Sequence, residues 1–158
     1  MLKHPGRFIF SVALSAVLIF ALVNAFSVND EKRIKRALYA AILGIEKNDA
    51  SRYSRVLSLR YKDDSGLGKA EVLALAEKAF RDFKPFKMEL KRLIIKPQGD
   101  SAESEIAFRC LFRKEGDEKI YYDAGKVMAS WRREEGGWKI VKMQYTGSTD
   151  MLFLPAVA

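Results

Sequence analysis

Two adjacent carboxylates, Asp63 and Asp64, are the side chains of this 158-residue chain whose type and spacing best suit acid–base chemistry. A carboxylate held in an apolar pocket has a raised pKa and can abstract a proton from a substrate. Both residues, however, follow Tyr61 in a stretch of turn-forming composition. Aspartates at such positions bond nearby backbone amides and cap the next helix. Asp63 and Asp64 are therefore candidates for catalysis, and turn formation is the favoured interpretation.

Cysteine and histidine each occur once, as Cys110 and His4. A lone cysteine makes no intramolecular disulfide and no four-cysteine metal site. His4 precedes a long apolar segment, so the domain behind it is not expected to hold a Ser-His-Asp triad, a Cys-His pair or a histidine metal site. Cys110 alternates with apolar residues, which predicts a small buried hydrophobe rather than a nucleophile. We expect neither a metal nor another cofactor.

The N-terminal residues have the pattern of an export signal or membrane anchor. Lys3 and Arg7 precede an uncharged run from Phe8 to Val23. This run is shorter than the ~20 residues that a spanning helix needs, but continuing it to Val28 gives enough length. Small or modest residues before position 26 also fit a cleavage site after Ala25. Residues 1–28 are therefore predicted to be a signal peptide or a transmembrane anchor, and both interpretations stay open.

The charges around this segment predict a location in the cell envelope. The short basic start is typical of an export signal, which favours a periplasmic or inner-membrane-anchored domain. A basic cluster after the segment outnumbers the basic residues before it and supports the opposite, cytoplasm-facing orientation. This cluster consists of Lys32, Arg33, Lys35 and Arg36. Export is favoured, and the other orientation stays open.

The composition is that of one folded domain. Its net positive charge makes acidic partners the first hypothesis. The chain is 49% hydrophobic and 11% aromatic and carries a net charge of +8. Such a charge suits nucleic acid or anionic lipid. Most charges nevertheless form mixed-sign pairs, as in Arg132–Glu135, and no nucleic-acid recognition motif is present. The sequence therefore argues against nucleic acid and favours the membrane, reached through the N-terminal segment.

Hydrophobic spacing predicts three helices in the first half of the domain. Asn29–Lys47 carries one apolar stripe at helical spacing. Asp49 is placed to cap a short helix from Ala50 to Ser58. A further helix is predicted over Lys69–Phe83, before Pro85.

Everything after Pro85 alternates with period two and predicts strands. The parity slips between Leu90 and Leu93, which indicates a bulge. Gly125 is a natural bend within the strand Lys119–Arg133. The expected fold class is α+β: an N-terminal hydrophobic helix, then three helices packed on a curved four-strand antiparallel sheet.

The apolar face of this sheet must turn towards the helices. By alternation it should carry Ile106, Phe108, Cys110, Phe112, Val127, Ala129, Trp131, Val141, Met143 and Tyr145, with Leu38, Ile42 and Phe80 closing over it. Small residues on the third strand should leave a cavity suited to a hydrophobic small molecule. The predicted ligand pocket is formed by Tyr53, Tyr61, Phe108, Cys110, Phe112, Ala129, Trp131, Met143 and Tyr145. The apolar tail, residues 151–158, is expected to fold back onto the sheet, as a plug or otherwise, with contact to a partner as the alternative.

The order and punctuation of these segments resemble the nuclear-transport-factor-2-like (NTF2-like) superfamily, also called SnoaL-like or cystatin-like. The resemblance covers Asn29 to Thr146 and rests on four places: Ile45–Asp49, Tyr61–Asp63 with Gly66 and Lys69–Val72, Gly99–Ala102, and Glu134–Val141. It implies a cone-shaped domain over residues 29–150. Some members of this superfamily with one N-terminal transmembrane helix are envelope scaffolds.

The resemblance leaves two functions open. The favoured one is a non-catalytic envelope domain that binds a hydrophobic small molecule or a protein partner, the partner being a second copy or another envelope protein. The alternative is a small exported enzyme of the ketosteroid-isomerase type, which uses carboxylate and tyrosine groups. Fold analogy alone does not choose between them. An aspartate or glutamate buried inside the cavity beside a tyrosine would favour the enzyme, whereas an apolar or filled cavity with a broad apolar patch outside would favour the scaffold.

Overall fold

The computed structural model describes residues 28–147 and 152–154. Its elements are a helix over residues 28–46, α2 (Ala50–Ser54), α3 (Lys69–Asp82), β1 (Lys87–Gln98), β2 (Ser101–Arg113), β3 (Ile120–Glu134), β4 (Gly137–Gly147) and β5 (Leu152–Leu154). The predicted signal or anchor lies, apart from Val28, outside the described residues. Within the described ranges, no helix combines the length and the apolar character that crossing a membrane requires.

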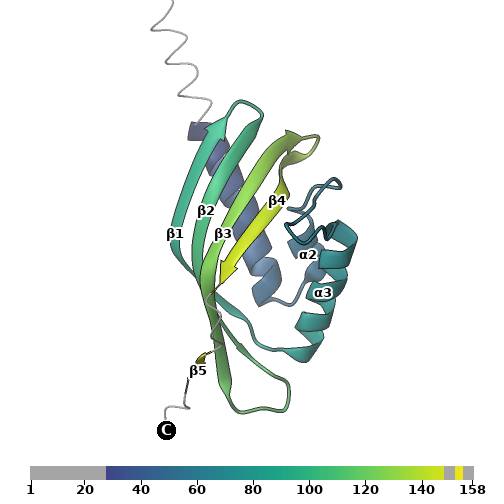
Figure 1. Cartoon of the computed structure of the whole chain (residues 1–158), viewed down its shortest axis with the longest axis vertical. Helices are drawn as coiled ribbons and strands as arrows, with labels where there is room; N and C mark the ends of the chain where they lie inside the picture. Colours follow the sequence, from purple (N-terminus) through teal and green to yellow (C-terminus); the bar gives the residue numbers. More distant parts are fainter. Residues whose placement is uncertain (1–27, 148–151, 155–158) are drawn as a thin grey trace, which may run out of the picture.

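The strands form an antiparallel meander in the order β1-β2-β3-β4. Figure 1 shows the helix over residues 28–46 lying across one face of the curved sheet, with α2 and α3 beyond the β4 edge. Helices on one face of an antiparallel sheet make an α+β fold, as the sequence predicted. The arrangement leaves one sheet face for the core and the other for solvent.

The apolar tail adds a short strand to the sheet. Leu152 pairs with Tyr122 and Leu154 with Ile120, so β5 continues along the β3 edge that β4 occupies further up. For these three residues the expectation that the tail folds back onto the sheet is confirmed. They extend the edge of the sheet beside Ile120–Tyr122. Residues 151 and 155–158 of the tail lie outside the described residues.

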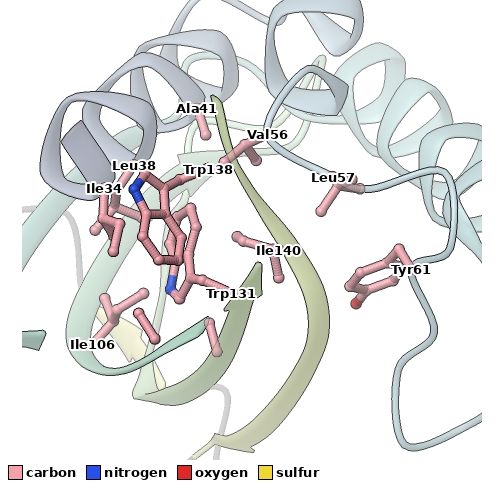
Figure 2. Packing of buried hydrophobic residues seen from close by; sticks show 12 residues of the cluster. Ile34, Leu38, Ala41, Val56, Leu57, Tyr61, Ile106, Trp131, Trp138 and Ile140 are labelled. Atoms are coloured by element: carbon pink, nitrogen blue, oxygen red, sulfur yellow. The ribbon is translucent and has the colours of Figure 1, made fainter. Parts of the chain in front are cut away.

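The hydrophobic core lies between the first helix and the β3–β4 end of the sheet. Figure 2 shows the indole rings of Trp131 and Trp138 between Ile34 and Leu38 of the helix and Ile106 of the sheet. Trp131 is 1% exposed, and its Nε1 donates to Ser104 Oγ at 2.9 Å. This bond satisfies a buried polar group that would otherwise destabilise the core.

The short helix α2 begins where the sequence predicts but ends earlier. The Asp49 carboxylate accepts the Arg52 amide at 2.8 Å and caps it, yet the helix stops at Ser54 rather than Ser58. Two backbone bonds to β4 explain the early end. Ser58 N donates to Ile140 O at 2.9 Å, and Ile140 N donates to Val56 O at 2.8 Å. Residues 56–58 therefore lie extended beside the sheet.

Two bulges set which side chains face the helices. The pairing of β1 with β2 shifts between Leu90 and Arg92, as the parity slip predicted. A second shift, in the β3–β4 pair, places Trp131 opposite Ile140 and Ser130 opposite Lys142. The prediction that Val141 faces the helices is therefore wrong, because Val141 is the extra residue of this bulge. Ile140, 3% exposed, takes that position in the core.

Candidate ligand-binding cavity

A cavity of about 660 Å³ lies between the helices and the lower half of the sheet. Its apolar wall comes from every layer of the fold: Leu38, Ala41, Ile42 and Ile45 from the first helix, Val72 from α3, and Met88, Leu90, Ile106, Phe108, Phe112, Val127 and Met143 from the strands. Alternation along the strands positions these residues, since every second side chain points to the same face. The wall is continuous with the core around Ile140.

The structure brings seven of the nine predicted pocket residues around this cavity. They are Tyr53, Tyr61, Phe108, Cys110, Phe112, Met143 and Tyr145. Ala129 and Trp131 face the same side of the sheet but do not line the cavity. Both are fully packed in the core, at 0% and 1% exposure, because the first helix covers their end of the sheet. The cavity lies beside the other half of β3, around Asp123 and Val127.

Aromatic rings enclose the lower end of the cavity. Phe112 on β2 lies 5.3 Å from Phe83 and 5.8 Å from Phe86 between ring centroids, and it stacks on Tyr121 of β3 at 5.9 Å. Phe80 of α3 meets Phe86 edge to face at 5.6 Å. Edge-to-face and offset pairs of this kind stabilise a cluster beyond simple burial. They tie α3 to the sheet where the first helix no longer reaches.

A carboxylate that the sequence reasoning did not identify lies in the cavity wall. Asp123 on β3 accepts the Tyr145 hydroxyl through both oxygens, at 2.8 and 2.7 Å. Burial, and then the hydrogen bond to Asp123, raises the pKa of Tyr145 to about 12, so this hydroxyl stays protonated at neutral pH. The signal for Asp123 was present in the sequence, because it shares the parity of Val127 and Trp131.

The two carboxylates that the sequence did single out are engaged in local structure. Asp63 Oδ1 accepts the Leu67 amide at 2.8 Å, which closes the loop before α3. Asp64 Oδ1 lies 3.0 Å from Lys142 Nζ and 3.2 Å from Gln144 Nε2 on β4. Both residues line the cavity, and Asp64 is exposed at its rim. Their contacts are those of a turn and a loop-to-strand tether.

Three other titratable groups on the wall are held in their neutral forms. Burial raises the pKa of both Tyr53 and Tyr61, and for Tyr61 the neighbouring Tyr53 and Asp63 add to the effect. Burial, followed by the nearby charges of Asp123 and Glu46, raises the pKa of the Cys110 thiol to about 12. A neutral thiol is a poor nucleophile. The wall thus presents hydrogen-bond donors rather than reactive anions at these positions.

The described residues contain no group of three or more His, Cys, Asp or Glu side chains that could hold a metal ion. The oxygen-bearing polar side chains that line the cavity are those of tyrosines, aspartates and Ser65. They suit hydrogen bonding and proton transfer.

No family model matches the chain, and no curated protein matches it. Solved structures do. An NTF2-like superfamily protein from Salmonella enterica serovar Typhimurium is similar with a TM-score of 0.69 and 15% identity, covering 78% of this chain and 94% of that one. A candidate scytalone dehydratase from Novosphingobium aromaticivorans gives 0.72 and 11%, covering 82% and 91%. A type 2 hexachlorocyclohexane dehydrochlorinase gives 0.64 and 15%, covering 83% and 97%.

These similarities agree with the observed strand order and with the helices that pack on one face of the sheet. At such low sequence identities the similarities establish the fold only, and any function must be argued from the residues of the cavity. The fold of this chain is that of the NTF2-like proteins.

Proposed function

We propose that this domain binds a hydrophobic small molecule in the cavity between helices and sheet. The observation that carries the proposal is the cavity itself, about 660 Å³ with an apolar wall and a few polar groups. Small-molecule sites have volumes of roughly 300–1,000 Å³ and this same division between apolar wall and sparse polar groups. The hydroxyls of Tyr53 and Tyr61 would orient the ligand by donating hydrogen bonds.

A second candidate function is acid–base catalysis, and the Asp123–Tyr145 contact favours it. The Asp123 carboxylate would be the base for proton abstraction next to a carbonyl, and Tyr53 or Tyr61, which line the same cavity, would donate a hydrogen bond to that carbonyl. Two of the similar structures are named for a dehydratase and a dehydrochlorinase. Deuterium incorporation into a hydrophobic cyclic ketone in D₂O, followed by NMR, separates the two functions. Faster exchange with the wild type than with Asp123→Asn supports the enzyme, and equal rates support binding alone.

Photo-crosslinking tests the binding proposal. The full chain, in a neutral detergent, is irradiated with a small uncharged aliphatic diazirine, and the labelled peptides are mapped by mass spectrometry. We expect label on the β2 and β4 segments that carry Phe108 and Met143. Label confined to exposed apolar residues such as Leu75 and Met128, at 56% and 41% exposure, would contradict the proposal.

We further propose that residues 1–28 direct the domain to the cell envelope, with export favoured. The support is the uncharged run from Phe8 to Val23 behind a short basic start. A homodimer or an envelope protein partner remains part of the same proposal. A reporter enzyme that is active only outside the cytoplasm should be active when it is fused after Ala158. Cytoplasmic activity of the fusion would support the opposite orientation.

A further inference from the structure

A second hollow, of about 810 Å³, lies on another side of the domain and is strongly basic. It runs between the first helix, α2 and the β3–β4 turn. Its lining includes six basic side chains, Arg33, Arg36, Arg52, Arg55, Arg133 and Lys139, against one acidic side chain, Asp49. We call this the basic groove. Val56 alone lines both the groove and the apolar cavity, so the two sites are separate.

Most of this positive charge is not neutralised by the protein. In residues 28–147 and 152–154, Arg33, Arg36, Arg52 and Arg55 form no salt bridge with an acidic side chain. Arg109 on β2, by contrast, lies 3.0 Å from the carboxylate of Glu89. Cations gathered in a concave site without counter-charges attract an anion, and guanidinium groups match phosphate with two parallel hydrogen bonds.

Arg133 is the fixed point of the groove. Its guanidinium bonds the buried Asp30, contacts Asp100 at 3.3 Å and lies 5.1 Å over the ring of Trp138. Lys139 Nζ donates to Arg55 O at 2.5 Å, which ties α2 to β4 at the other wall. The walls of the groove therefore come from the first helix, the α2 segment and the β3–β4 hairpin. Its arginines without a salt bridge lie on the first helix, on α2 and directly after α2.

The basic surface continues on the outer face of the first helix. A smaller hollow beside the groove shares Arg36 and Arg52 with it and adds Lys32, Lys35 and Tyr39. Val28, Lys32, Lys35 and Tyr39 follow one another at spacings of four, three and four, so they lie on one helical stripe. Val28 and Tyr39 are 53% and 49% exposed. Lysines with exposed apolar and tyrosine side chains are typical of a membrane interface.

We propose that the basic groove binds the phosphate of an anionic phospholipid headgroup. Basic clusters directly after an apolar segment attract anionic lipid, and Lys32 stands nine residues beyond the uncharged run that ends at Val23. Within the groove Trp138 is 4% exposed and is covered by Arg133, so it offers no free ring on which a nucleic-acid base could stack. The lipid source rests on the proposed membrane role of the N-terminal segment.

The test uses the full chain in micelles of a neutral detergent, with phosphatidylglycerol or phosphatidylcholine added at increasing mole fraction. Tryptophan fluorescence reports on the groove through Trp138. Arg52→Glu/Arg55→Glu removes two groove cations, and Lys78→Glu/Arg81→Glu is the matched control, because these exposed α3 residues lie outside the groove. Arg33→Gln/Arg36→Gln is a second groove variant that keeps the proposal testable if the first does not fold.

Wild type and control should bind phosphatidylglycerol alike, and each groove variant should bind it at least about ten-fold more weakly. Phosphatidylcholine should give little signal. If the groove and control variants lost affinity for phosphatidylglycerol equally, the net charge of the protein would explain the binding, and the proposal would be overturned. Full competition by inorganic phosphate, or a groove that binds an oligonucleotide in preference to lipid, would overturn the headgroup assignment. Crosslinking of the apolar cavity by the diazirine should be unchanged in the groove variants, so the two proposals fail separately.

Discussion

The hydroxyl of Tyr145 on β4 donates to the carboxylate of Asp123 on β3, at 2.7 and 2.8 Å from its two oxygens. The contact crosses between neighbouring strands on the side that lines the cavity. Because the carboxylate still has free acceptor capacity, a bound ligand could donate to Asp123 while its apolar body contacts the wall. In the binding proposal, the polar end of a ligand would therefore lie at this pair.

Replacing Asp123 with Asn should lower the pKa of Tyr145. In the wild type, burial and the Asp123 carboxylate together raise it to about 12. Removing the carboxylate leaves burial and the nearby Cys110, so the pKa of Tyr145 should fall towards, but stay above, the ordinary value of 10. Alkaline titration of tyrosinate absorbance measures this, with Tyr145→Phe variants to subtract the other tyrosines. An unchanged pKa would mean that the hydrogen bond does not persist in solution.

Cys110 should be chemically inert. It is 8% exposed, and the pKa of its thiol is raised to about 12, so an aromatic disulfide reagent at pH 8 should label it slowly until the protein unfolds. Cys110→Ala should cost about 1 kcal/mol of unfolding free energy. Rapid labelling of the folded protein would refute the burial.

The same thiol should contribute to alkaline destabilisation. Its pKa is raised from 9.0 in the unfolded chain to about 12 in the folded one. Its contribution to stability is therefore complete below pH 9 and is lost as the pH rises from 9 through 12, since only the unfolded state ionises easily there. Denaturation at several pH values should show a steeper loss for wild type than for Cys110→Ala. Parallel curves would contradict the shift.

Removing the hydroxyl of Ser104 should destabilise the core. Trp131 Nε1 donates to this oxygen at 2.9 Å, and both side chains are at most 2% exposed. Ser104→Ala leaves the indole N–H buried without an acceptor, which costs about 1–3 kcal/mol. Ser130→Ala is the control, since its exposed bond to Glu103 should be worth less than about 0.5 kcal/mol. Equal effects of the two variants in urea denaturation would contradict the account of the core.

Gly44 should tolerate no side chain. A Cβ at this position would lie 2.7 Å from the backbone nitrogen of Tyr53, where the first helix and α2 approach closely. Helix propensity alone predicts that Gly44→Ala stabilises the protein by about 1 kcal/mol. We expect the opposite sign, a loss of about 1–3 kcal/mol, because backbone must move. A higher melting temperature for the variant would show that the contact is loose.

Much of this fold could be predicted from the sequence, because hydrophobic periodicity and capping residues determine where its helices, strands and bulges lie. The slip of parity after Leu90 correctly indicated a bulge, and Asp49 was correctly identified as a helix cap. A bulge also lies at Val141, between Ile140 and Lys142. The prediction missed it, because it extended the alternation of Tyr145 and Met143 to Val141 and so placed Val141 on the inner face. The register there depends on backbone bonds from Val56 and Ser58 to Ile140. Contacts between segments so distant in sequence leave no periodic signal.

The candidate sites divide in the same way. Strand alternation placed Phe108, Cys110 and Phe112 on one face. Carried four residues back from Val127 along β3, it would also have included Asp123. It could not tell which part of that face the first helix fills, and so it assigned Ala129 and Trp131 to the cavity. Sequence reasoning found Arg33 and Arg36 in one basic cluster but not the basic groove, because the other arginines of the groove come from elements that only the folded chain brings beside them.

The most direct test of the ligand-binding account fills the cavity and leaves the opposite face as a control. Met143 lines the cavity, whereas Met128 is 41% exposed on the outer face of the neighbouring strand. Nile red, an uncharged apolar dye, is titrated into the full-length wild type, Met143→Trp and Met128→Trp in identical neutral micelles. The account predicts binding at least about ten-fold weaker for Met143→Trp, equivalent to about 1.4 kcal/mol, with Met128→Trp matching the wild type. Equal affinities for the two variants would contradict it.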